Sequence, residues 1–91
     1  MGYTQEQCQF IKSLDFMKLG QSVNHEQWQS AAMLIRRMDS KAKEVGLNGF
    51  ERQFTGLRQC INRKDKAQAK QVLSIVVNKR VQIMKQIQEE K

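Results

Sequence analysis

The side chains that could carry out a reaction are few and widely separated in this sequence. The chain has one histidine, His25, and two cysteines, Cys8 and Cys60, and neither cysteine has a partner at a metal-ligand spacing. No paired carboxylates, Cys–His spacing or glycine-rich phosphate loop indicates acid–base, nucleophilic or phosphate chemistry. We therefore predict that the protein is not an enzyme and has no catalytic residue, metal site or cofactor.

Positive charge is the second chemical feature. The 16 Lys and Arg residues outnumber the 9 Asp and Glu residues, which gives a formal charge of +7 and favours an acidic partner. However, the basic residues are dispersed along the chain and most aromatic residues fall on apolar stripes, whereas nucleic-acid modules concentrate charge and add aromatic platforms. A solvated basic surface is favoured, and nucleic-acid binding stays open as an alternative.

Targeting signals are not evident in the sequence. The N-terminus shows no basic run followed by an apolar run, and no segment approaches the roughly 20 apolar residues that span a bilayer. We expect a cytoplasmic protein with reduced cysteines and no membrane association.

The elements that must position these side chains are predicted from capping signals. Residues three apart have capping-box spacing at Thr4–Gln7, Asn24–Gln27, Asn48–Glu51 and Asp65–Gln68. Gly20 and Gly46 are expected to end the first two helices. The predicted helices span about 4–19, 25–45, 49–62 and 66–88. His25 then lies in the first turn of the second helix, where a solvent-facing residue is favoured.

Apolar periodicity predicts how these helices pack. The clearest stripe, at spacings of three and four residues, consists of Trp28, Ala31, Ala32, Ile35, Met38, Ala42 and Val45. The last stripe is interrupted by Lys79 and Arg80, and the β-branched run from Ile75 to Val77 keeps the helical period. Because short connections make consecutive helices antiparallel neighbours, we predict one all-α domain over residues 1–91, an antiparallel up-down four-helix bundle.

One face of the second predicted helix is a candidate binding surface. Met33, Arg36, Arg37 and Ser40 lie beside the apolar stripe, since residues three and four apart are neighbours on a helix. Met and Arg are enriched at protein interfaces, so an exposed Met33 beside two arginines would suit a protein partner. These four residues are the predicted partner-binding residues.

The segment from Trp28 to Leu47 resembles the central helix of histidine-phosphotransfer (HPt) domains, an aromatic-led helix that carries the phosphorylated histidine and ends at a glycine, here Gly46. The resemblance continues over about residues 22–87. Its remaining parts are the apolar residues Phe50, Phe54, Leu57 and Ile61, the turn Asn62-Arg63-Lys64-Asp65, and the apolar residues Ala69, Val72, Leu73 and Val76. It implies an HPt-like fold.

The resemblance places Arg36 at the family's phosphoacceptor histidine, Asp39 at its following lysine and Ser40 at its close-packing glycine. Arginine stays charged and offers no nucleophilic nitrogen comparable with that of imidazole, so Arg36 cannot accept phosphate. The resemblance therefore implies a degenerate, pseudo-phosphotransfer member.

The predicted function is a non-catalytic HPt-like adaptor of bacterial two-component signalling. Its expected partner is a protein, for which the receiver domain of a response regulator is the candidate, bound through the second helix. A nucleic-acid-associated basic bundle is one alternative. A structural oligomerisation module, with Met33 or Leu34 covered by another copy, is a second, and phosphotransfer through His25 is the enzyme alternative. The sequence leaves the oligomeric state open.

Overall fold

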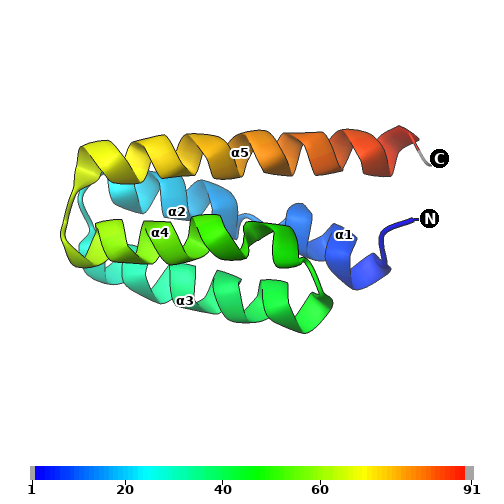
Figure 1. Ribbon diagram of the computed structural model, residues 1–91, viewed down its shortest axis with the longest axis horizontal. Coiled ribbons are helices and arrows are strands. Elements are labelled where there is room, and N and C mark those ends of the chain that lie inside the picture. The colour runs from blue at the N-terminus through cyan, green and yellow to red at the C-terminus, as the bar shows by residue number, and fades with distance from the viewer. Residues whose placement is uncertain (1, 90–91) are drawn as a thin grey trace.

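The computed structural model describes residues 2–89, and helices form almost all of this part of the chain (Figure 1). The α-helices are α1 (Gln5–Ile11), α2 (Asp15–Asn24), α3 (Trp28–Val45), α4 (Glu51–Asn62) and α5 (Lys66–Glu89), and a 3-10 turn, η1, spans Asn48–Phe50. No strand occurs between residues 2 and 89, and the run Ile75–Val77 lies within α5. The all-α prediction is confirmed.

The helices lie side by side as four rods, with α1 and α2 together forming one of them (Figure 1). The chain reverses direction between α2 and α3, between α3 and α4, and between α4 and α5 (Figure 1). Both α2 and α4 contact α3 and α5, so the rods enclose one core. The resulting body measures 40 × 21 × 20 Å.

Four phenylalanine rings form the centre of the core. Phe50 stacks on Phe54 at a centroid distance of 5.3 Å, and it meets the rings of Phe10 and Phe16 at 6.2 and 5.9 Å with steep interplanar angles. All four side chains are buried. Such edge-on and stacked contacts add stability beyond the apolar area that they bury.

The predicted apolar stripe of α3 is largely buried. Its buried members are Ala31, Ile35, Met38, Ala42 and Val45. Trp28 and Ala32 are only partly buried and pack against the edge of the core.

The continuous first helix predicted over residues 4–19 is wrong, because the chain breaks between α1 and α2. At the break, the Ile11 carbonyl accepts a hydrogen bond from Arg80 Nε at 2.6 Å. The Ser13 hydroxyl accepts one from the Asp15 backbone N–H at 3.1 Å, which helps α2 to start. Gly20 does not end a helix either, since α2 continues past it to bury Val23.

The start of the second predicted helix is also wrong. Asn24 is the last residue of α2 and His25 is its exposed C-cap, so α3 begins at Trp28 rather than at residue 25. The backbone N–H of Glu26 donates to Val23 and that of Gln27 to Ser22, at 3.1 and 2.8 Å. This Schellman-type ending puts Glu26 in the left-handed region, with φ of 56°.

Two of the four capping predictions are confirmed by hydrogen bonds. Thr4 Oγ1 accepts from the Gln7 backbone N–H at 3.1 Å, and Gln7 Oε1 accepts from the Thr4 N–H at 3.0 Å. Asp65 Oδ1 accepts from the Gln68 N–H at 3.1 Å. The Asn48–Glu51 cap is wrong, because η1 leads directly into α4 with no side-chain cap at Phe50.

Two cationic residues of α5, Lys79 and Arg80, interrupt its apolar stripe. Each contacts a place where a helix on the other side of the core begins or ends. Lys79 Nζ donates to the Gly49 carbonyl in η1 and lies 6.0 Å from the centroid of Phe50. Arg80 binds the end of α1, and its guanidinium carbon lies 5.1 Å from the Phe16 centroid. The two charged side chains therefore stabilise the packing of α5 against the backbone at these helix ends.

Gly20→Ala and Gly46→Ala are expected to change stability in opposite directions. Gly46 ends α3 with φ of +82°, so alanine should cost about 1 kcal/mol of backbone strain. Gly20 lies inside α2 with open space where a Cβ would stand, so alanine should stabilise by about 0.5–1 kcal/mol. Urea denaturation of both variants measures these changes, and destabilisation by Gly20→Ala would contradict the helical placement of that glycine.

Candidate protein-binding face

The side of α3 that points away from the core carries Met33, Arg36, Arg37 and Ser40, which we call the α3 outer face. All four residues are exposed, and 73% of the Met33 surface is accessible. They share this side because the buried residues of α3 lie on the opposite side of the helix, facing the core. The structure thus brings the four predicted residues together on one exposed surface.

The two arginines of the α3 outer face differ in their ionic contacts. Arg37 Nη2 lies 3.0 Å from Asp15 Oδ1 and ties α3 to the start of α2. Arg37 remains 63% exposed, and such surface pairs contribute little to stability. No carboxylate in the described part of the chain lies within ion-pair distance of Arg36. Its charge is therefore available to a partner.

An open surface depression runs along this face. Its lining residues are Ser30, Met33, Leu34, Arg36 and Arg37. An accessible methionine beside two arginine side chains combines apolar contact with directional donors, which is the chemistry of a protein interface.

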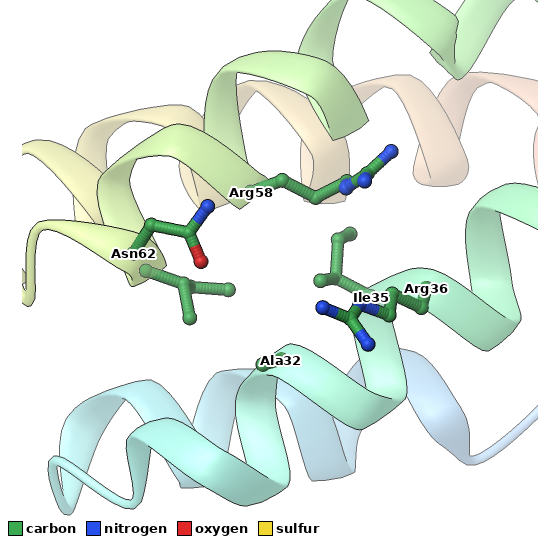
Figure 2. Close-up of a pocket in the computed structure, with 6 residues that line it drawn as sticks. Ala32, Ile35, Arg36, Arg58 and Asn62 are labelled. Carbon is green, nitrogen blue, oxygen red and sulfur yellow. The ribbon is translucent and has the colours of Figure 1, made fainter.

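A narrower groove adjoins the face on the side of α4 (Figure 2). We call it the α3–α4 groove, and its lining residues are Ala32, Ile35, Arg36, Arg58, Ile61 and Asn62. The spacing of residues along α3 does not reveal Arg58 and Asn62, because both come from α4. Their proximity to Arg36 depends on how the two helices pack.

Asp39, a buried carboxylate next to the α3–α4 groove, neutralises part of the positive charge there. Asp39 Oδ2 lies 3.4 Å from Lys43 Nζ and 3.6 Å from Arg58 Nη1. The Asp39 side chain is only 8% exposed, and its Oδ1 atom has no hydrogen-bond partner in the structure. The buried carboxylate orients both cations but leaves Arg36 unpaired.

The residues considered for chemistry lie on different elements. His25 ends α2, whereas partly buried Cys8 belongs to α1 and buried Cys60 belongs to α4. Within residues 2–89, no group of three or more His, Cys, Asp or Glu side chains could hold a metal ion. None of the helices over the same residues has the length and apolar character needed to cross a membrane.

Fold and surface together define an all-α protein that presents an exposed apolar and cationic face on α3. Comparison with models of protein families, with curated protein sequences and with solved structures found no match.

Proposed function

We propose that the protein is a non-catalytic, HPt-like signalling adaptor that binds an acidic surface of a receiver domain through the α3 outer face. The observation that carries this proposal is Arg36, which is exposed in the middle of α3, unpaired with any described carboxylate and close to exposed Met33. The alternating helix directions and the end of α3 at Gly46 support the resemblance to HPt domains.

The chemistry of Arg36 suits an acidic partner. A guanidinium group presents its donors in a planar fork that matches the two oxygens of a carboxylate. Met33 offers flexible apolar surface beside it, which adapts to an irregular partner surface. A docking face of this composition would bind by charge attraction and apolar burial together.

The same residue makes phosphotransfer by this face unworkable. Arg36 occupies the position that the resemblance assigns to the phosphoacceptor histidine, and a charged guanidinium has no free nitrogen lone pair to attack phosphorus. His25 lies in the connection between α2 and α3 and does not belong to the α3 outer face. We therefore propose binding without transfer.

Charge reversal at Arg36 tests this function. In calorimetric titrations against a panel of receiver domains, Arg36→Glu should weaken the observed binding at least about tenfold, because it replaces a donor by a group that repels the acidic partner. Lys85→Glu makes the same charge change at an exposed position of α5 and should weaken binding less than about twofold.

Either of two results would refute the proposal. One is the absence of binding to every receiver domain tested. The other is an equal loss of affinity in Arg36→Glu and Lys85→Glu, which would assign the attraction to net charge rather than to the α3 outer face.

A further inference from the structure

The α3–α4 groove brings three nitrogen-bearing side chains around one small hollow. Figure 2 shows Arg36 and Asn62 reaching toward the hollow from its two ends, whereas the Arg58 side chain runs along the α4 rim. Ile35 and Ile61 are buried and form the apolar floor. A polar ligand in this hollow would meet donors at its rim and little water beneath it.

The arginine side chains of the groove carry more positive charge than the neighbouring carboxylate neutralises. Two of its lining residues, Arg36 and Arg58, are cationic, and Asp39 Oδ2, which pairs with Arg58, is shared with Lys43 outside the groove. Two guanidinium groups from facing helices repel each other, and a bound anion would remove that repulsion. Arg58 is 47% exposed, so its remaining N–H groups are accessible.

We infer that the α3–α4 groove binds phosphate, as the inorganic ion or as a monoester. Such a group carries about −1.5 to −2 charge at pH 7 and presents several acceptor oxygens in a tetrahedron. Arg36 and the Asn62 side-chain amide donate to different oxygens from the two ends of the hollow, and Arg58 reaches a third oxygen by turning in from the α4 rim. A carboxylate, with two oxygens in one plane, matches this three-sided arrangement less well.

This site goes beyond the proposed function and does not depend on it, because a phosphate ion needs no protein partner. Arg58 and Asn62 lie outside the α3 outer face, so variants of these residues separate the two ideas. Loss of receiver binding would leave the phosphate site standing, and loss of phosphate binding would leave the receiver interface standing.

A titration followed by two-dimensional 15N NMR tests the site. Sodium phosphate should shift the Asn62 side-chain amide and the Nε–H signals of Arg36 and Arg58 saturably, and sodium chloride at equal ionic strength should not. Arg58→Gln and Asn62→Ala should weaken phosphate binding, the former about tenfold. The matched control is Arg52→Gln, an exposed position of α4 that does not line the groove and should keep the affinity.

A parallel titration with O-phosphoserine identifies the source of the phosphate. Tighter binding of inorganic phosphate supports a site for the free ion, and tighter binding of O-phosphoserine supports a site for an esterified phosphate. The inference is overturned if chloride produces the same shifts as phosphate. It is also overturned if Arg58→Gln and Asn62→Ala bind phosphate as well as Arg52→Gln does.

Discussion

Phe50→Ala is expected to lower the free energy of unfolding by about 3–5 kcal/mol, the range for removing a buried aromatic side chain. Phe50 is 0% exposed and touches the rings of Phe10, Phe16 and Phe54, so its removal leaves a cavity and ends three aromatic contacts. A chain of this length is expected to have a total stability of about 5–14 kcal/mol. The substitution should therefore remove a large part of the total.

Chemical denaturation followed by far-ultraviolet circular dichroism measures this loss. Ile75→Ala is the matched control, because Ile75 is a large apolar residue that is 52% exposed on α5. Its stability should change by less than about 0.5 kcal/mol. If Phe50→Ala costs under about 1 kcal/mol, the four-ring centre of the core is wrongly placed.

Arg80→Met should destabilise the protein by about 2–3 kcal/mol, although methionine keeps most of the aliphatic stem. The change removes the charged donor to the Ile11 carbonyl, at 2.6 Å, and the contact of the guanidinium with the Phe16 ring. Because α1 ends at Ile11, this carbonyl has no helical partner to replace Arg80. The loss should concentrate at the break between α1 and α2.

Native-state hydrogen exchange in Arg80→Met should accordingly show the largest loss of protection in α1 and at the start of α2. Lys70→Met, on an exposed part of the same helix, should stay within about 0.5 kcal/mol of the parent. Equal destabilisation by both substitutions would show that a general change in charge, rather than the Arg80 contacts, supports the fold.

The helical class and several helix ends were predictable from local signals. Thr4 with Gln7 forms a full capping box, and Gly46 ends α3 in the left-handed conformation. Both signals act within a few residues of the chain, so neighbouring residues suffice to specify them.

The helix ends that were mispredicted depend on contacts or conformations without a local signature. The break after Ile11 contains neither glycine nor proline and is stabilised by Arg80, which lies 69 positions away in the sequence. Glu26, just after the end of α2, adopts a left-handed φ of 56°, a conformation that is uncommon outside glycine, asparagine and aspartate. Glycine is the usual residue for this conformation, so the sequence indicated Gly20 as the helix end. In the structure Glu26 takes that conformation instead.

The candidate site was predictable only where it lies on a single helix. Met33 and Arg36 could be placed on one face because helical spacing alone sets their relation. Arg58 and Asn62 could not be joined to them, since the packing of α4 against α3 decides which residues meet. The orphaned Oδ1 atom of buried Asp39 is likewise a property of packing.

Mapping of amide chemical shifts on addition of a receiver domain tests the central claim most directly. We predict that the shifts centre on the α3 outer face and decline toward α5. The competing candidates are other exposed apolar residues, Leu14 and Met17 at α2 and Val77 and Val81 on α5. Shifts that centre on those residues, with the α3 outer face unchanged, would contradict the proposed function.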